Sequence, residues 1–237
     1  MSKIIVSQIS KSFGKHTVLN DISFSVNKGE MIGIIGASGS GKTTLIQCML
    51  GIKTPDSGNV TIDDQFMPDL DALQRIGYMA QSDALYSDLT GLEHLKFFGK
   101  LYKMKRTLLN ESINHVAEIT ELTPHLKKRV ENYSGGMKRR LSLAISLLHN
   151  PELIILDEPT VGIDPLLKRK IWHELHHLKQ HGKTIILTTH LMEEAELCDK
   201  LLLLNHNKMI GFGSPERLKA HYHANSIEDI FIKAGNL

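Results

Sequence analysis

The segment Met31-Ile-Gly-Ile-Ile-Gly36-Ala-Ser-Gly-Ser-Gly-Lys42-Thr43 decides the fold of this chain. Its first five residues form an apolar run that predicts a strand buried on both faces, and residues 42–50 predict an apolar helix. Residues 36–43 between them match the pattern G-x-x-x-x-G-K-[ST]. Glycines let several backbone N–H groups converge on one phosphate, and the helix N-terminus adds partial positive charge. The segment therefore predicts a phosphate-binding loop.

The polar side chains of this loop have separate expected roles. Lys42 can reach the β and γ oxygens of a bound nucleoside triphosphate, and the Thr43 hydroxyl can bind Mg²⁺. Mg²⁺ is therefore an expected cofactor. The loop residues expected to contact the nucleotide are Gly36, Ser38, Gly39, Ser40, Gly41, Lys42, Thr43 and Thr44.

Two adjacent carboxylates follow a second apolar run at residues 153–156. Asp157 and Glu158 lie at the carboxyl end of this predicted strand, where ligands bind in open α/β sheets. Taken alone, the pair is equally compatible with solvated acids that cap a strand. Beside a phosphate-binding loop, Asp157 is expected to hold Mg²⁺ through water, and Glu158 to accept the proton of the attacking water.

Strand and helix patterns alternate along most of the chain. The predicted buried strands span residues 31–35, 153–156, 184–187 and 200–204. The predicted helices span residues 42–50, 134–149 and 165–181. This alternation predicts an α/β fold, a P-loop NTPase core with a parallel sheet.

Two further regions are expected on this core. Alternating apolar residues at 3–9, 18–26 and 58–62 predict an N-terminal antiparallel β subdomain. The stretch 88–131 has no strand signal, and its helical runs at residues 91–102 and 108–121 predict an inserted helical subdomain. We expect a single domain of residues 1–237, with 1–87 and 132–237 forming the core and β subdomain.

Composition limits the partners and the compartment. The formal net charge of +2 gives no bulk electrostatic reason to expect nucleic-acid binding. The two cysteines, Cys48 and Cys198, are far apart in the sequence, which favours a reducing compartment. The longest apolar runs are too short to span a bilayer, and no signal peptide is evident. The expected location is the cytoplasm.

A second glycine pair follows Tyr133 in the segment Ser134-Gly135-Gly136-Met137-Lys-Arg-Arg140. A serine at a helix N-cap followed by two glycines with free backbone amides predicts a second anion-binding loop in the same chain. With this segment, the phosphate loop and the acid pair, the sequence resembles the nucleotide-binding domains of ABC ATPases. The resemblance covers nearly the whole chain. The resemblance implies ATP as the nucleotide, and it implies that residues 134–136 form the signature loop, which binds the γ-phosphate held by the opposite subunit.

The resemblance assigns roles to further residues in chain order. Gln81 resembles the glutamine that contacts Mg²⁺ and water and relays to the membrane partner. Asp164 resembles the aspartate of the loop that crosses the dimer interface, and His190 resembles the switch histidine that contacts the γ-phosphate. Phe13 is expected to stack on adenine, with Val18 also at the nucleotide, although Phe13 is equally compatible with a place in the core of the β subdomain.

Two departures from the family pattern are informative. Met137 stands where many members have glutamine, and with the following basic residues it resembles the drug- and antibiotic-exporter branch. Val161 stands where serine is frequent, so one hydrogen bond to the facing phosphate loop is in doubt. The family resemblance therefore favours export of drug-, antibiotic- or lipid-like compounds.

The resemblance implies a nucleotide-sandwich dimer, homomeric in the simplest case, that drives a separately encoded membrane permease from the inner face of the cell membrane. An ABC ATPase acting on ribosomes or DNA is the first alternative, but two nucleotide domains or a long coiled-coil insertion are absent from the sequence. A P-loop kinase would leave the signature loop unexplained.

Two other patterns receive more ordinary interpretations. His173, His177 and His181 are spaced four residues apart on one predicted helix, and that spacing could hold a metal. A solvated helix face is the commoner explanation. The basic runs at residues 127–129, 138–140 and 168–170 are expected to be solvated or to make local anion contacts.

Overall fold

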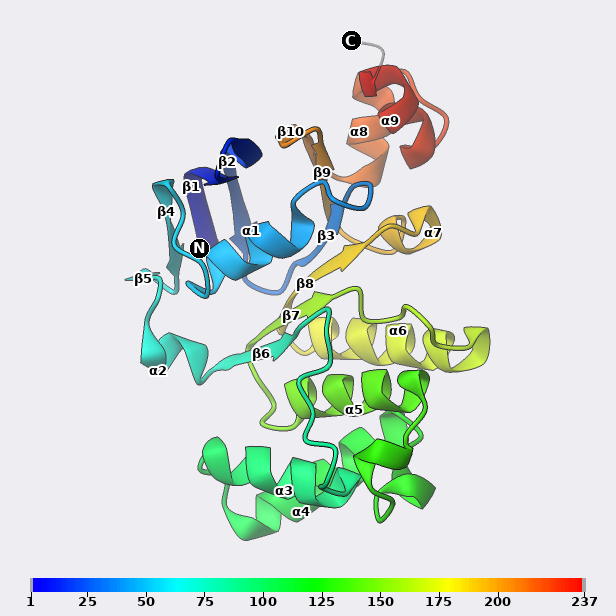
Figure 1. Ribbon diagram of the computed structural model, residues 1–237. Helices are drawn as coiled ribbons and strands as arrows, with labels where there is room; N and C mark the ends of the chain where they lie inside the picture. Colours follow the sequence, from blue (N-terminus) through cyan, green and yellow to red (C-terminus); the bar gives the residue numbers. More distant parts are fainter. Residues whose placement is uncertain (1, 236–237) are drawn as a thin grey trace. The chain divides into compact units, whose positions relative to one another are not determined.

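The computed structural model describes residues 2–235, which divide into two compact units. Unit 1 comprises Met1–Leu73 and Thr184–Leu237, and unit 2 comprises Gln74–Lys183. Each unit has its own strands and helices, labelled in Figure 1.

The first sheet of unit 1 is antiparallel, in the order β2-β1-β4-β5. Its strands are β1 (Ser2–Phe13), β2 (His16–Asn27), β4 (Ser57–Ile62) and β5 (Gln65–Phe66). Alternate apolar residues of β1 and β2 are buried, among them Val6, Ile22 and Phe24. The predicted antiparallel β region is thus confirmed. Both long strands extend further than predicted, because a tight turn at Gly14, with φ 60°, pairs Phe13 with His16.

The second sheet of unit 1 contains three parallel strands and one antiparallel strand. β3 (Met31–Ile35) pairs in parallel with β8 (Thr184–Thr189) and with β9 (Lys200–Asn205), and β10 (Lys208–Gly213) pairs antiparallel with β9. All residues of β3 and β8 are buried, as their apolar runs predict. The patterns missed β10, since Gly211 and Gly213 interrupt its apolar alternation.

The helices of unit 1 follow its strands. They are α1 (Lys42–Met49), α2 (Leu70–Leu73), α7 (Met192–Ala195), α8 (Pro215–His221) and α9 (Ile227–Gly235). Of these five, α1 was predicted at residues 42–50 after the phosphate-loop motif; it begins at Lys42 as expected and ends at Met49. Within residues 2–235, none of the helices combines the length and the apolarity needed to cross a membrane.

Unit 2 is built on a parallel strand pair, β6 (Ile76–Met79) and β7 (Leu153–Asp157). The helix α5 (Gly135–Leu147) packs against both strands, and α6 (Pro165–Gln180) follows β7 in the sequence. A Cβ at Gly77 would lie 2.1 Å from the carbonyl oxygen of Ser146, so glycine is required where α5 approaches β6 this closely.

The predicted helical stretch lies inside unit 2 and contains α3 (Gly91–Leu101), α4 (Arg106–Ile119) and two 3-10 helices at Thr123–His125 and Val130–Asn132. Thr90 starts α3 through a capping box: it accepts from Glu93 N at 3.2 Å, while its own N–H donates to Glu93 Oε2 at 2.8 Å.

The two ends of this helical stretch lie side by side. An isolated bridge pairs Thr90 with Arg129, and the N–H of Glu131 donates to Ser87 O at 2.9 Å. Joined ends are the geometry of an insertion. The boundaries at residues 88 and 131 stay predictions, because the stretch belongs to one compact unit with β6, β7, α5 and α6.

A half-buried histidine just after α5 gives unit 2 a testable pH dependence. The rings of His149 and Tyr102 stack with centroids 3.7 Å apart and an interplanar angle of 12°. Burial lowers the pKa of His149 to about 4. Because an unfolded histidine has a pKa near 6.5, the unfolded chain binds more protons between these values. Stability is therefore complete above about pH 6.5 and falls as the pH drops toward 4.

Replacing His149 with phenylalanine is expected to remove this loss while keeping a stacked ring. Between pH 7 and pH 5 the wild type should lose about 1 to 2 kcal/mol more unfolding free energy than His149→Phe. Urea unfolding of both proteins at the two pH values measures the difference. Equal losses in the two proteins would show that His149 titrates normally in the folded state.

Candidate nucleotide site

The predicted phosphate loop connects β3 to α1 in unit 1. Gly41 is the N-cap of α1 and has a left-handed conformation with φ 100°, and Gly39 has φ 80°. A Cβ at Gly41 would lie 2.8 Å from Val18 O, and one at Gly36 would lie 2.5 Å from Leu204 O. Side chains at these positions would push the loop away from its neighbours. Glycine is therefore required where the loop packs against Val18 and Leu204.

Two buried polar groups lie inside the loop. The Lys42 side chain is 6% exposed, and its Nζ donates to Gly36 O at 2.8 Å and to Ala37 O at 3.0 Å. The Ser40 hydroxyl is buried with no hydrogen-bond partner among the described residues. A buried hydroxyl without a partner is costly, and a phosphate oxygen would satisfy it. The loop therefore fits the phosphates of a nucleotide.

A cavity of about 250 Å³ lies against the outer side of this loop. It is lined by the loop residues Ala37, Ser38, Gly39 and Ser40, by His16, Thr17 and Val18, and by Asn205, His206 and Asn207. Val18, which was predicted to lie near the nucleotide, is therefore next to the phosphate loop. The turn between β9 and β10 was not predicted to be there, because no motif marks it.

Phe13 ends β1 with its ring 46% exposed. The ring is therefore not a core residue of the β subdomain, which removes the alternative interpretation of this position. Two cations lie near it, Lys53 Nζ at 5.2 Å and Lys11 Nζ at 5.8 Å from the ring centroid. An exposed aromatic face is available for stacking on a base, and its contact with adenine stays a prediction.

His190 follows directly after β8, not within it, and is exposed. In the parallel register, Thr189 pairs with Ile35. His190 and Gly36 therefore directly follow the paired last residues of β8 and β3. The carboxyl ends of parallel strands share one edge of a sheet. The structure thus brings His190 to the edge that holds the phosphate loop.

The acid pair lies at the corresponding edge of unit 2. Asp157 is the last residue of β7 and is fully buried, while Glu158 is half-buried. Glu158 has φ 53°, a left-handed conformation that costs a non-glycine residue free energy and clusters at functional sites. The prediction that these acids merely cap a strand in solvent does not fit Asp157, whose side chain is inaccessible.

Gln81 lies at the same edge as the acid pair. Met79 of β6 pairs with Leu156 of β7, so Gln81 and Glu158 each lie two residues beyond a paired position. Gln81 is exposed. Within unit 2 the structure therefore brings together the predicted Gln81, Asp157 and Glu158.

Arg139 is a residue of this edge that the sequence analysis missed. It is 7% exposed, so the expectation of a solvated basic run at residues 138–140 is wrong for this position. Its guanidinium donates to the carbonyl oxygens of Ala80, Gln81, Asp157 and Glu158. A signal was present, since Arg139 precedes Leu143 by four residues and shares its buried helix face.

The predicted signature loop begins α5. Ser134 is the N-cap, and its Oγ accepts from Met137 N at 3.3 Å. A Cβ at Gly135 would meet nothing within 4 Å, whereas one at Gly136 would lie 3.2 Å from Gly162 O. A cavity of about 220 Å³ lies here, lined by Ser134, Gly136, Arg140, Gly162, Ile163, Asp164 and Leu167. Arg140 was not predicted as a site residue, and it adds positive charge to this cavity.

Asp164 joins the same cavity from the N-terminus of α6. Its Oδ1 accepts from Leu167 N at 3.1 Å, so the carboxylate caps the helix. The side chain is nevertheless exposed, as is that of Val161. The structure thus places the predicted signature loop and the predicted interface aspartate on one open surface of unit 2.

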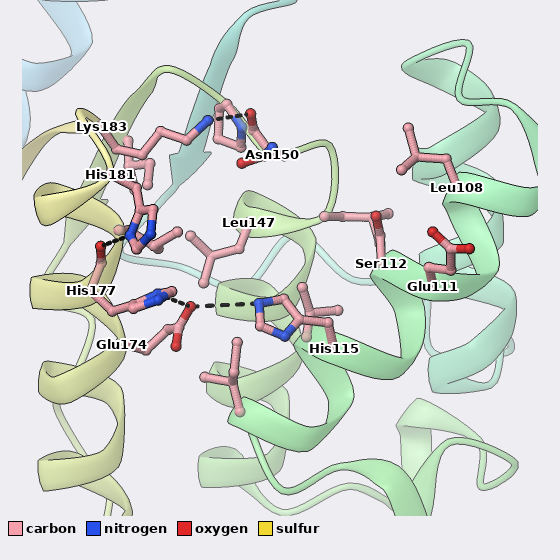
Figure 2. A pocket seen from close by; sticks show the side chains of 16 residues that line it. Leu108, Glu111, Ser112, His115, Leu147, Asn150, Glu174, His177, His181 and Lys183 are labelled. Atoms are coloured by element: carbon pink, nitrogen blue, oxygen red, sulfur yellow. Dashed lines mark hydrogen bonds and ion pairs between the residues drawn. The ribbon is translucent and has the colours of Figure 1, made fainter.

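His177 of α6 and His181 just after it line a different cavity, of about 560 Å³, between α4, α5 and α6. Figure 2 shows Glu174 between His115 and His177, with N–O distances of 3.5 and 3.8 Å. The His177 and His181 rings lie 4.3 Å apart. Among residues 2–235, no group of three or more histidine, cysteine, aspartate or glutamate side chains is arranged to hold a metal ion. His173 does not line the cavity.

Comparison with known proteins identifies the family. The model of the family described as ABC transporter matches residues 19–161. The chain is 40% identical over 236 residues to the Nod factor export ATP-binding protein I of Rhizobium sp. (strain N33), covering 98% of this chain and 78% of that protein. It is 38% identical over 231 residues to the linearmycin resistance ATP-binding protein LnrL of Bacillus subtilis (strain 168), covering 96% and 74%.

Solved structures agree with this assignment. An ATP-binding subunit of an ABC transporter superposes with a TM-score of 0.92 at 26% identity, over 99% of this chain and 100% of that one. A dimeric ATP-binding cassette in a post-hydrolysis state with ADP and Pi superposes with a TM-score of 0.82 at 25% identity, over 89% and 98%. These matches confirm the predicted fold and ATPase activity. The chain belongs to the ABC transporter family, as an ATP-binding subunit that hydrolyses ATP.

Proposed function

We propose that this chain is the motor subunit of an exporter and works as a dimer with two shared ATP sites. Each ATP would lie between residues 36–44 of one copy and residues 134–136 of the other. The observation that carries the proposal is the presence of two glycine-containing helix N-termini, those of α1 and α5, each beside a cavity, in one chain. Two copies joined head to tail would supply two complete sites.

On the phosphate-loop side, the backbone amides of residues 36–41 and the Lys42 ammonium would neutralise the phosphates. The hydroxyl of Ser40 would donate to a phosphate oxygen in place of its missing partner. Phe13 would stack on adenine, with Val18 beside the loop.

Mg²⁺ would be held by oxygen donors of the kind it prefers. Thr43 in the first turn of α1, Gln81 after β6, and Asp157 through water offer hydroxyl, amide and carboxylate oxygens. Each of these oxygen types is a donor that magnesium takes in proteins. When bound, the ion would neutralise charge on the β- and γ-phosphates.

Hydrolysis would need one proton acceptor and several groups that orient the reactants. Glu158 would accept a proton from water as the water oxygen bonds to the γ-phosphorus and the bond to the ADP oxygen breaks. His190 would hold the γ-phosphate, and Gln81 would help to place the water. Glu158 has a left-handed backbone conformation of the kind that clusters at functional sites, which supports this role.

The signature loop would bind the nucleotide of the other copy only while that nucleotide keeps its γ-phosphate. The amides of Gly135 and Gly136, with Arg140 beside them, would bind the γ-phosphate and close the dimer, and Asp164 would cross to the facing loop. Loss of the γ-phosphate would remove this link and open the dimer. Such cycles of closing and opening would switch a permease between inward- and outward-facing states.

The permease would be a separate membrane protein that docks on unit 2 near Gln81. Exposed aromatic and apolar side chains support this surface: Tyr86 is 56% exposed, Phe97 44% and Leu101 62%, and the Tyr86 and Phe97 rings lie 5.8 Å apart. The subunit would then act at the inner face of the cell membrane, without contact to nucleic acid.

Export of a drug-, antibiotic- or lipid-like compound is the direction that the relatives support. Those compared above are named for Nod factor export and for linearmycin resistance. Met137 in the signature segment agrees with this branch. The permease, which would line the transport path, would determine the compound itself.

The shared-site dimer is tested by the solution mass of a variant that binds ATP without hydrolysing it. Glu158→Gln is expected to shift from monomer to dimer on addition of Mg-ATP, because the γ-phosphate link persists. Adding Ser134→Arg should abolish the shift by filling the signature loop. Light scattering with and without Mg-ATP measures both proteins.

The matched control is Arg169→Gln in the Glu158→Gln background, since Arg169 is exposed on α6 and lines none of these cavities. This control should dimerise like its parent. A Glu158→Gln protein that binds ATP tightly and stays monomeric would contradict the homodimer and would point to a different partner subunit.

A further inference from the structure

One buried cation in unit 2 holds the backbone of both predicted catalytic loops. Arg139 Nη1 donates to Ala80 O and to Gln81 O, each at 2.8 Å. Its Nη2 donates to Glu158 O at 2.6 Å and to Asp157 O. One guanidinium therefore joins the segment after β6 to the segment after β7.

The chemistry of this contact suits arginine in particular. Four carbonyl oxygens converge on a planar group that keeps its charge and presents donors in a fixed fork. Lysine has one ammonium on a flexible stem and could not reach both loops with the same geometry. At the other side of the guanidinium, Asp83 Oδ1 lies 3.7 Å from Nη1 and accepts from Ser142 Oγ at 2.7 Å. The arginine is thereby oriented by its own helix.

Three of the carbonyl groups bound by Arg139 belong to Gln81, Asp157 and Glu158, the residues with proposed roles at the nucleotide. Fixing the carbonyls of Asp157 and Glu158 fixes the peptide between them, and with it the left-handed φ of 53° at Glu158. Fixing the carbonyl of Gln81 orients the residue that follows β6 at the same sheet edge. A loop held only by its ends would have more freedom at these positions.

The helix that carries Arg139 also carries the signature loop. Ser134 is the N-cap of α5, and Arg139 lies five residues later, in the second turn of the same helix. A rigid helix transmits a shift at its N-terminus to that turn. In a dimer, the ATP at Ser134 belongs to the other copy, whereas Glu158 acts on the ATP of its own copy.

We propose that Arg139 is a positioning residue that links the signature helix to the backbone of Gln81 and Glu158, and thereby couples the two ATP sites of the dimer. This inference rests on the proposed function, in which Glu158 is the proton acceptor and Ser134 contacts the partner's nucleotide. Arg139 itself touches neither nucleotide. Its effect is exerted through the two loops.

The test compares Arg139→Lys and Arg139→Gln with the exposed control Arg169→Gln. Turnover is counted per ATP-binding molecule, measured by nucleotide titration, so that an unfolded fraction does not lower kcat. We expect kcat to fall about 10-fold for lysine and about 100-fold for glutamine. The Kd for ATP should change less than about threefold, because the phosphate loop lies in unit 1. The Hill coefficient for ATP should fall toward one.

A double-mutant cycle separates positioning from general destabilisation. If Arg139 acts through Glu158, Arg139→Lys should cost almost nothing further in the Glu158→Gln background. An equal fold loss in both backgrounds would overturn the proposal, as would a kcat and Hill coefficient equal to those of the control. Full turnover by Glu158→Gln alone would instead contradict the proposed function.

Discussion

Replacing Glu158 with glutamine is expected to lower kcat by about 10² to 10⁴-fold, the range lost when a general base is removed. Glutamine keeps the size of the side chain but cannot accept the proton of the attacking water. The Kd for ATP should remain within about threefold of wild type, because the residues proposed to bind phosphate are in the loop between β3 and α1. Steady-state phosphate release and equilibrium nucleotide binding measure the two quantities.

A matched control for this substitution is Glu118→Gln. Glu118 lies on α4 of the same unit with an exposed side chain and lines none of the cavities described above, so its replacement removes one charge outside them. Its kcat should equal that of the wild type. A Glu158→Gln protein that hydrolyses ATP at the wild-type rate would assign the proton to another acceptor, and His190 would be the first candidate to replace.

Replacing Lys42 with methionine is expected to weaken ATP binding about 100-fold. Hydrogen bonds to charged groups contribute about 1.5 to 3 kcal/mol each, and about 2.7 kcal/mol corresponds to two powers of ten. Methionine preserves most of the buried stem, which is 6% exposed, and removes only the ammonium. Calorimetric titration with Mg-ATP measures the Kd, and circular dichroism shows that the variant is folded.

Lys208→Met is the control for this prediction, because Lys208 is an exposed lysine of β10 in the same unit. Its Kd should match the wild type. If Lys42→Met binds ATP as tightly as the wild type, the ammonium remains with the carbonyls of Gly36 and Ala37 and does not reach the phosphates. The loop would then bind phosphate through its amides alone.

Local sequence patterns predicted most elements of the fold. The runs at 31–35 and 184–187 became β3 and β8, since short apolar runs of this kind are typical of strands buried on both faces. The helix after Ser134 begins where the predicted N-cap places it, and α6 begins at Pro165 as predicted. β10 was not predicted, because its glycines leave no clear alternation of apolar and polar residues. It forms a strand by pairing with β9.

The sequence by itself determined the family, and it predicted the phosphate loop, the acid pair and the signature loop, because each of these three is a short run in which neighbouring residues act together. Only the tertiary structure decided that Phe13 is exposed, that Arg140 lines the signature cavity, and that Arg139 is a buried cation. The carbonyls bound by Arg139 lie up to 59 residues away in sequence. A basic side chain in a helix is ordinarily solvated, and only the packing of α5 against β6 and β7 brings it to four backbone oxygens that no local pattern connects.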